Sequence, residues 1–364
     1  MKWEIAKLGK IAIIRTGKLD SNAAVIGGRY PFFTCDPNTL SIDVWAYDTE
    51  AVLLAGNNAS GNYTAKYYKG KFNAYQRTYI IESANEEELN IRYLCYALNQ
   101  QLRLLKTMSS GSTTKFLTVR MLDNLDIPLF GINIQTQIVN ILSAYDDLIE
   151  NNQKQIKLLE EAAQRLYKEW FVDLRFPGHE NTKIVDGVPE GWNICPFSSK
   201  VDIMSGGTPK TSIPDYYNGR IPFYTPKDSD GAFFAYKTQM NITEGGLKNC
   251  NSRLYPPKTV IITARGTVGK TTILAVPMAM NQSCYALKMK ENDAPYYLFF
   301  ALNNEIKALQ TMANGGVFNT IIGKTFDSIN IQIPKDPLIY GFEETVRPFM
   351  EQIKNKLQAN LKLV

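Results

Sequence analysis

The sequence predicts an α+β protein made of two similar lobes and two long helices that pair as an antiparallel coiled coil. Three observations support this prediction: a heptad pattern of apolar residues runs through the middle of the chain, the segments on either side of it resemble each other, and the pattern returns at the C-terminus. We expect a first lobe at 1–132, a central helix at 133–175, a linker and second lobe at 176–336, and a shorter C-terminal helix at 337–364.

The composition is that of an ordinary soluble protein with a mild excess of positive charge. The chain has 364 residues, of which 45% are hydrophobic and 21% charged, and its net charge is +5. This length exceeds what one hydrophobic core usually supports, so two domains are expected. No apolar run approaches the roughly 20 residues that span a bilayer, and the segment after Met1 does not read as a signal peptide. We therefore expect a cytoplasmic protein without a membrane partner.

Cysteine and histidine usage argues against metal binding and catalysis. The five cysteines lie far apart, and the single histidine, His179, lies in a segment flanked by proline and glycine. Zinc sites and disulfide frameworks need closer spacings, and one histidine in such a segment offers little scope for a nucleophilic site. The sequence predicts neither catalytic nor metal-binding residues.

The central stretch carries apolar residues at alternating spacings of four and three. This heptad pattern keeps one stripe of a helix against a partner helix. Roughly 39 residues at about 1.5 Å each make a rod of about 60 Å. Asn152 is the single polar residue of the seam, and an isolated asparagine in such a seam fixes the register. The seam residues predicted to pair are Ile138, Leu142, Tyr145, Ile149 and Asn152.

The chain repeats itself at a constant offset. Tyr93-Leu94 corresponds to Tyr297-Leu298, and Thr107-Met108 corresponds to Thr311-Met312. In that register the central seam falls on a second set of apolar residues, which we predict to be the other side of the helix pair: Phe342, Val346, Phe349 and Ile353. The chain is thus two copies of one lobe and one helix. If the second helix returns toward the first lobe, the helices are antiparallel and an approximate two-fold axis relates the lobes.

Each lobe is predicted to contain both strands and helices. Runs of β-branched and apolar residues indicate strands, and apolar residues at helical spacing indicate helices that end in glycine-containing loops. The predicted strands are 51–55, 78–81, 125–129, 259–264, 285–289 and 329–334, and the predicted helices are 87–107 and 296–312.

Two similar surfaces at a fixed separation suit duplex DNA, because a two-fold reader contacts half-sites one or more helical turns apart. Loops with Asn, Gln, Lys, Arg, Tyr and hydroxyl side chains could contact base edges and phosphates. The candidates in the first lobe are Lys18, Asn57, Asn58, Ser60, Asn62, Tyr63, Lys66, Tyr67, Lys69, Ser112, Thr113 and Lys115. Those in the second lobe are Thr208, Lys210, Lys227, Arg265, Thr267, Lys270, Gln282, Asn314, Asn319 and Lys324.

Two other functions fit parts of the sequence. Residues 264–271 follow an expected strand and match a relaxed phosphate-loop pattern, which would make the chain a nucleotide-binding enzyme. The residues after Thr271 are β-like and end at Pro277, whereas a phosphate loop leads into a helix. The other alternative is a coiled-coil scaffold that does not bind DNA.

The central block resembles a known family. The run 135–142, the charged helix 146–161, the segment 164–173 ending in Trp170-Phe171-Val172-Asp173, and the turns Phe176-Pro177-Gly178 and Pro189-Glu190-Gly191-Trp192 are similar to the central region of specificity subunits of type I restriction-modification enzymes. With the repeat included, the resemblance covers nearly the whole chain.

This resemblance implies two target-recognition domains that read the halves of a split DNA site, with antiparallel helices as a ruler between them. It implies no catalysis and no cofactor in this chain. The implied partners are double-stranded DNA, modification (methyltransferase) subunits, two in number, and restriction (motor-nuclease) subunits. Those subunits would bring adenine methylation with S-adenosylmethionine and cleavage driven by ATP with magnesium.

Overall fold

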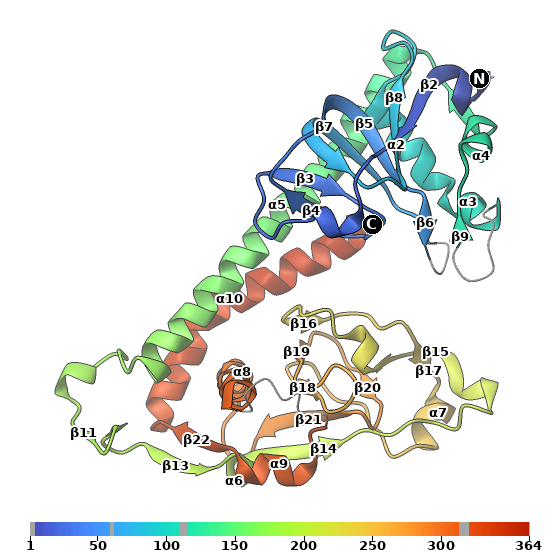
Figure 1. Cartoon of the computed structure of the whole chain (residues 1–364). Coiled ribbons are helices and arrows are strands. Elements are labelled where there is room, and N and C mark those ends of the chain that lie inside the picture. Colours follow the sequence, from blue (N-terminus) through green and yellow to red (C-terminus); the bar gives the residue numbers. More distant parts are fainter. Residues whose placement is uncertain (1–3, 59–61, 109–114, 313–319, 364) are drawn as a thin grey trace. The chain divides into compact units, whose positions relative to one another are not determined.

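The computed structural model describes residues 4–58, 62–108, 115–312 and 320–363. The chain divides into two compact units, residues 1–147 and 148–364, and the boundary falls inside the long helix α5 (Ile132–Tyr167). Figure 1 labels the elements of both units. No helix of the described part has the length and apolar character needed to cross a membrane.

The first unit contains the first lobe and the beginning of α5. Its main sheet has six strands in the order β2-β8-β5-β7-β3-β4, and β1 pairs with β10 just before α5 begins. Its elements are β1 (Glu4–Lys7), α1 (Leu8–Ile11), β2 (Ala12–Thr16), η1 (Ser21–Ala23), β3 (Tyr30–Phe33), β4 (Leu40–Ile42), β5 (Tyr47–Ala55), β6 (Asn57–Asn58), β7 (Ala65–Ala74), β8 (Thr78–Ser83), α2 (Ile91–Gln100), α3 (Leu102–Met108), β9 (Lys115–Phe116), α4 (Val119–Asp123) and β10 (Asp126–Leu129).

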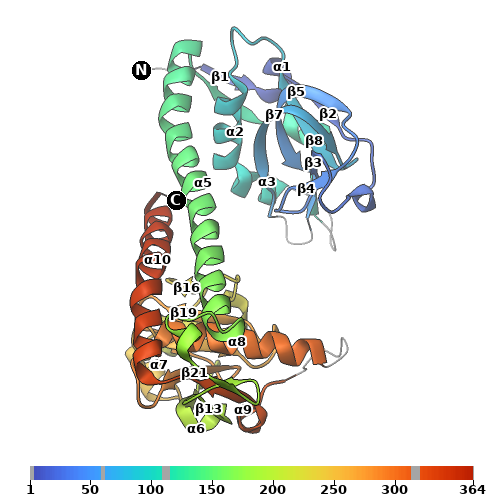
Figure 2. The same ribbon diagram turned by 90° about the vertical axis from the view of Figure 1, so that its left-hand side faces the viewer.

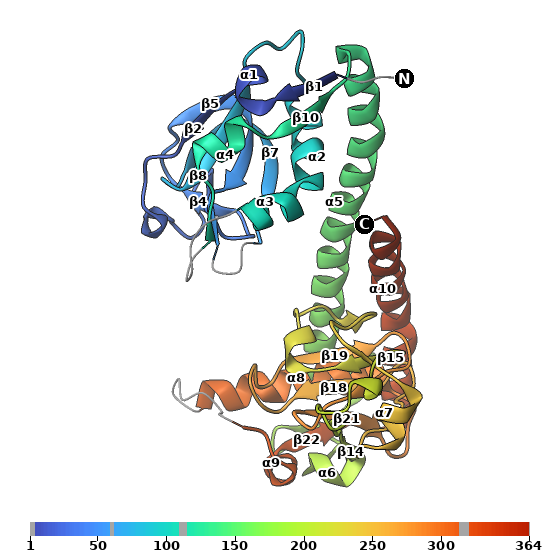
Figure 3. The ribbon, with the colours of Figure 1, turned by 90° about the vertical axis from the view of Figure 1, so that its right-hand side faces the viewer.

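The sheet of the first unit is buried on both faces. Val52 and Leu54 of β5 pack with residues of α2, whereas Ala51 and Leu53 point to the opposite cluster around Phe72. Successive side chains of a strand point to opposite faces, so a continuous apolar run is what a strand buried on both sides requires. Figure 3 shows α2 between this sheet and α5.

The second unit contains the second lobe, the rest of α5 and the C-terminal helix α10. Its main sheet has five strands in the order β14-β21-β18-β19-β16. Its elements are η2 (Lys168–Val172, a π-helical turn), η3 (His179–Asn181), β11 (Ile184–Val185), β12 (Val188–Pro189), β13 (Asn193–Pro196), α6 (Phe197–Lys200), β14 (Val201–Ser205), η4 (Pro214–Tyr216), β15 (Tyr217–Tyr224), η5 (Pro226–Asp228), β16 (Phe234–Ala235), β17 (Asn241–Ile242), α7 (Glu244–Lys248), β18 (Val260–Thr263), β19 (Thr271–Leu274), β20 (Ala279–Met280), β21 (Cys284–Met289), α8 (Pro295–Met312), α9 (Gly323–Ser328), β22 (Asn330–Ile333) and α10 (Asp336–Leu363).

The two lobes share strand pairings as well as sequence. In each lobe a strand before the first sheet pairs antiparallel with the strand that leads into a long helix: β1 with β10, and β13 with β22. The central pairings also correspond, because β8 lies between β2 and β5 as β21 lies between β14 and β18. The repeat seen in the sequence is therefore a repeat of the fold.

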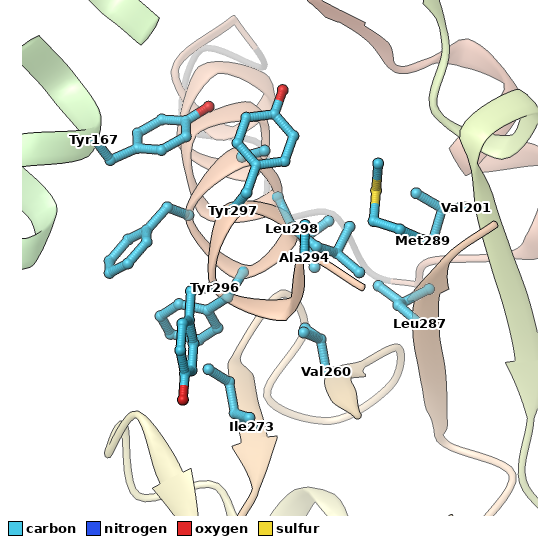
Figure 4. Packing of buried hydrophobic residues seen from close by; sticks show 14 of the residues in the cluster. Tyr167, Val201, Val260, Ile273, Leu287, Met289, Ala294, Tyr296, Tyr297 and Leu298 are labelled. Atoms are coloured by element: carbon cyan, nitrogen blue, oxygen red, sulfur yellow. The ribbon is translucent and has the colours of Figure 1, made fainter. Parts of the chain in front are cut away.

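The core of the second unit is an aromatic cluster between α5, α8 and α10. The Phe342 ring of α10 lies 5.9 Å from Tyr167 and 5.1 Å from Phe171 (centroid to centroid). Tyr167 also stacks on Phe300 of α8 at 5.9 Å. Figure 4 shows Tyr167 of α5 beside Tyr297 of α8, with Val260, Ile273 and Leu287 of the sheet packed under that helix.

Helix α10 runs antiparallel to the second half of α5. Near its start Phe342 contacts Tyr167 and Trp170, and near its end Asn360 accepts a hydrogen bond of 2.8 Å from Asn152. Figure 2 shows the two helices side by side over this length. The pair includes Asn152 and the second set of predicted seam residues, Phe342, Val346, Phe349 and Ile353.

The first half of the predicted seam has a different environment. Ile138 packs against the core of the first lobe, Leu142 and Tyr145 are exposed, and Ile149 is half-buried. The heptad pattern had predicted that Ile138, Leu142 and Tyr145 contact the partner helix. The heptad period shows that a stripe of the helix is apolar but does not identify which surface covers each part of it.

Most predicted strands and helices have observed counterparts. There are two exceptions. Residues 66–71, expected to continue a polar loop, lie in strand β7. The helix expected at 87–107 is two helices, α2 and α3, separated at Gln101. Gln101 ends α2 outside the helical region, with φ −99° and ψ 2°.

Glu343 generates a prediction about stability and pH. This buried carboxylate of α10 accepts hydrogen bonds of 2.8 Å from the backbone N–H groups of Tyr296 and Tyr297, at the start of α8. Burial raises the pKa of the carboxyl to about 7, although those N–H groups lower it. The stability that this group contributes is therefore fully present below about pH 4.5 and is lost as pH rises through 7.

Replacing Glu343 by glutamine keeps an acceptor oxygen and removes the charge. The variant should gain stability over the unmodified protein as pH rises, by roughly 2–3 kcal/mol between pH 4.5 and pH 8. Urea unfolding at both pH values measures this difference. Glu344→Gln, at the exposed neighbour, is the control and should show no such trend. An equal difference at both pH values would contradict the raised pKa.

The amide pair of Asn152 and Asn360 generates a second prediction. Asn360→Leu leaves a buried amide without its partner, which costs about 1–3 kcal/mol, whereas changing both residues to leucine removes the unsatisfied group. Hydrogen exchange of the backbone amides of α10 should therefore speed up in the single variant and return toward the original rate in the double variant. Faster exchange in the double variant than in the single one would contradict the prediction that the unpaired amide causes the loss of stability.

Candidate nucleic-acid interface

The same three backbone hydrogen bonds hold one edge of the sheet in both lobes. In the first lobe they run from Tyr75 N to Phe33 O (2.9 Å), from Gly56 N to Arg77 O (2.8 Å) and from Leu117 N to Gly56 O (2.8 Å). In the second lobe they run from Asn281 N to Tyr224 O (3.0 Å), from Ala264 N to Ser283 O (2.7 Å) and from Ile321 N to Ala264 O (2.9 Å). We call these bonds the edge frame. They fix the backbone of the loops in which most of the predicted DNA contacts lie.

A glycine packs closely against each edge frame, beside Tyr75 in the first lobe and beside Asn281 in the second. A Cβ on Gly17 would lie 2.2 Å from the carbonyl oxygen of Ala74, and one on Gly206 would lie 2.2 Å from that of Asn281. Those distances are impossible for a side chain against backbone, so both positions require glycine. The segments that follow, with Lys18 and Thr208, are thereby held against the turns at residues 75–77 and 281–283.

In the first lobe the structure brings five of the predicted residues to this edge. Asn57 and Asn58 form β6, which pairs with Phe116 and Lys115 of β9. Lys18 is exposed, and the next residue, Leu19, bridges to Tyr75. Asn62 is exposed, and its side-chain oxygen accepts a 2.9 Å hydrogen bond from Lys106.

Four other candidates of the first lobe do not lie free in a loop. Tyr63 is buried in the core, with its hydroxyl unpartnered. Lys66, in β7, donates to the Asp36 carbonyl oxygen (3.4 Å) and to Thr39 (3.1 Å), and burial lowers the pKa of its amine.

Tyr67 and Lys69 contact Glu50 of the neighbouring strand. Tyr67 donates a 2.9 Å hydrogen bond to Glu50, and Lys69 forms a 2.9 Å ion pair with it. Burial, followed by the hydrogen bond to Glu50, raises the pKa of the Tyr67 hydroxyl to about 12. The loop assignment of these strand residues was wrong, because polar partners elsewhere in the sequence let a polar run pair inside the sheet.

In the second lobe the predicted residues gather more closely. Thr208 and Gln282 are hydrogen-bonded through their side chains, and the Thr267 hydroxyl donates to Pro226 O at 3.2 Å. Lys227 follows Pro226, and Arg265 follows Ala264 of the edge frame. Lys210, Lys270 and Lys324 lie on adjoining segments and are exposed. Ser60, Ser112, Thr113, Asn314 and Asn319 lie outside the described residues.

Sequence reasoning missed two residues of the first lobe's edge. Gln76 and Arg77 are exposed in the turn between β7 and β8, and Arg77 supplies a carbonyl oxygen to the edge frame. Gln76 donates a 3.0 Å hydrogen bond to Asp20 and corresponds to Gln282 in the repeat, a correspondence that could have identified it.

Several cations of these edges have no internal partner. Among the predicted and newly found residues of these two edges that the structure describes, seven exposed cationic side chains enter no hydrogen bond or ion pair: Lys18, Arg77, Lys210, Lys227, Arg265, Lys270 and Lys324. A cation that is not neutralised within the protein is available to the phosphates of a nucleic acid.

The phosphate-loop interpretation of residues 264–271 is wrong. The segment is the turn of a β-hairpin, in which Thr263 N donates to Lys270 O (2.9 Å) and Gly269 N donates to Thr263 O (2.9 Å). Thr271 begins strand β19, not a helix. A phosphate loop needs a helix N-terminus behind its lysine, so this hairpin cannot hold a nucleotide in that manner. Across the described residues no group of three His, Cys, Asp or Glu side chains could hold a metal ion.

Comparison with known proteins identifies the family. Residues 1–161 and 189–359 match the model of the type I restriction modification DNA specificity domain. The specificity subunit of the type I restriction enzyme EcoDI of Escherichia coli is 28% identical over 92% of this chain and 78% of its own. The MjaIX specificity subunit of Methanocaldococcus jannaschii is 27% identical over 72% of this chain and 62% of its own.

A solved structure shares the fold. The crystal structure of the S subunit of a type I restriction-modification system from M. genitalium matches with a TM-score of 0.60 and 16% identity, over 100% of this chain and 95% of that one. Since the family model matches one segment in each lobe and together these span most of the sequence, this chain belongs to the type I restriction modification DNA specificity domain family.

Proposed function

We propose that this chain is the DNA-specificity subunit of a type I restriction-modification enzyme. Each lobe reads one half of a bipartite duplex target, and α5 spans the distance between the halves. The chain itself performs no catalysis. It directs adenine methylation and restriction by partner subunits, which are two modification subunits and the restriction subunits.

The observation that carries this proposal is the repeated edge frame with different side chains on it. Gln76 and Arg77 stand in the first lobe where Gln282 and Ser283 stand in the second, and Asn57 stands where Arg265 stands. Glutamine and asparagine pair with adenine, arginine pairs with guanine, and serine accepts either base. One frame with two sets of side chains supports two half-sites of different sequence.

The cofactors of the assembled enzyme belong to its partners in this proposal. S-adenosylmethionine binds the modification subunits, and ATP and magnesium bind the restriction subunits. In this proposal the unpaired cations of both edges contact the phosphates of the duplex, and the partly paired amides and hydroxyls contact the edges of its bases.

Mapping methylated adenines in DNA from cells that carry this protein with its modification subunit tests the function. The expected result is a motif of two short sequences separated by a spacer of fixed length. A single uninterrupted motif, or methylation that does not depend on this protein, would refute the proposal.

Phosphate contacts and base contacts should respond differently to substitution. Lys227→Gln should weaken binding to all sequences alike and reduce the slope of log K against log salt by about one. Gln282→Ala should change the base preference at one position, at a cost of about 1–3 kcal/mol. Titration of the complex with its modification subunit against labelled duplexes at several salt concentrations measures both effects. Lys154→Gln, an equal charge change on the exposed face of α5, is the control, and a slope change of the same size there would contradict the assignment.

A further inference from the structure

Four residues form a polar contact between the first lobe and α5. Arg92 of α2 lies 3.4 Å from Asp147 and 3.9 Å from Asp146 of α5 (Nη2 to carboxylate oxygen). One turn along α2, the Tyr96 hydroxyl donates a hydrogen bond to Asp146. We call these four residues the clasp. Figures 2 and 3 both show α2 beside this part of α5.

A second contact, nearer the start of α5, holds the lobe by packing. Ile138 and Val139 pack against the core of the first lobe. The buried side chain of Gln135 donates to the carbonyl oxygens of Glu88 (2.7 Å) and Phe130 (2.6 Å) and accepts from Asn90 N (2.9 Å). From Ile138 to Asp146 the helix rises about 12 Å. A lobe anchored at one point of a helix can turn about it, and a second contact at this distance fixes the angle.

The clasp is continuous with the sheet of the lobe. The Arg92 guanidinium carbon lies 5.3 Å from the centroid of the Tyr67 ring, and Tyr67 donates to Glu50, which also pairs with Lys69. Arg92 therefore connects the strands β5 and β7 with the carboxylates of α5. Turning the lobe on the helix would break the contacts of Arg92 and Tyr96 with Asp146 and Asp147 together.

The second lobe is held on its own helix mainly by packing. At the offset of the repeat, Arg92 and Tyr96 correspond to Tyr296 and Phe300, and Asp146 and Asp147 correspond to Met350 and Glu351. One polar contact recurs, because the Tyr296 hydroxyl donates a 3.3 Å hydrogen bond to Glu351. Tyr296, Phe300 and Met350 are nevertheless buried, whereas the side chains of Asp146 and Asp147 are 53% and 70% exposed. Exposed ion pairs contribute little to stability, and added salt weakens them. A packed aromatic cluster contributes more and is not weakened by salt in this way.

We propose that the clasp sets the angle at which the first lobe is held on α5, and thereby the spacer length that the two lobes accept. Arg92 is then a positioning residue for target recognition. The inference rests on the proposed function. One additional base pair moves a half-site by about 3.4 Å along the duplex and turns it by about a tenth of a helical turn, so a change in lobe angle changes which spacer fits.

The test uses the full chain in complex with its modification subunit. Duplexes carry the mapped target with its spacer shortened or lengthened by one base pair, and methylation is measured at low and high salt. Arg92→Ala should reduce the preference for the native spacer by roughly threefold to tenfold. The base preference within each half-site should stay the same, which shows that the first lobe remains folded. Higher salt should weaken the spacer preference of the unmodified protein in the same direction.

A charge exchange separates the clasp from a general structural role. Arg92→Asp and Asp147→Arg should each relax the spacer preference, and the two together should restore it. Lys154→Ala breaks an exposed ion pair with Glu150 within α5 and should leave the preference unchanged. An unchanged spacer profile in Arg92→Ala, or no restoration in the double variant, would overturn the inference, whereas absence of a bipartite motif in the unmodified protein would refute the function itself.

Discussion

The packing of α10 against the second half of α5 is the interaction on which the rest of the second unit depends. It closes the aromatic core around Phe342, Tyr167 and Phe171, and it buries one face of α8. Buried aromatic residues dominate the energetics of such cores. The second lobe is built on this core, because the main sheet packs on the other side of α8. The long helix that leaves the first lobe is thus also part of the core of the second unit.

The sequence predicted the repeat and most of the strands because both can be recognised from residue type and spacing alone. Tyr93 and Tyr297, which correspond in the repeat, make the same contact in both lobes. Each hydroxyl donates to a backbone carbonyl oxygen of the strand that leads into the long helix: Tyr93 to Pro128, and Tyr297 to Gln332. The apolar runs at β5 and β18 gave the central strands for the same reason. Patterns with a period of two or of 3.5 residues can be read without knowing the partner.

What could not be predicted depends on partners distant in sequence. Residues Lys66 to Lys69 have the composition of a solvated loop. Their place in a strand depends on contacts with Glu50 and with the segment from Asp36 to Thr39. The lysine and threonine of the hairpin at 264–271 matched a phosphate-loop pattern. That pattern binds phosphate only when a helix follows it, and here strand β19 follows. The candidate contacts at Thr208 and Gln282 were found from residue type, but their hydrogen bond to each other required the fold.

The two glycines of the edge frame have a consequence for how such proteins can diversify. Gly17 and Gly206 tolerate no other side chain, whereas the exposed residues beside them contact no core. Variation is therefore confined to positions where it costs little folding free energy and where, under the proposed function, it would change the recognised sequence. A lineage of such chains can explore new specificities by drift in these loops while the scaffold stays constant, and an engineered library should randomise the same positions.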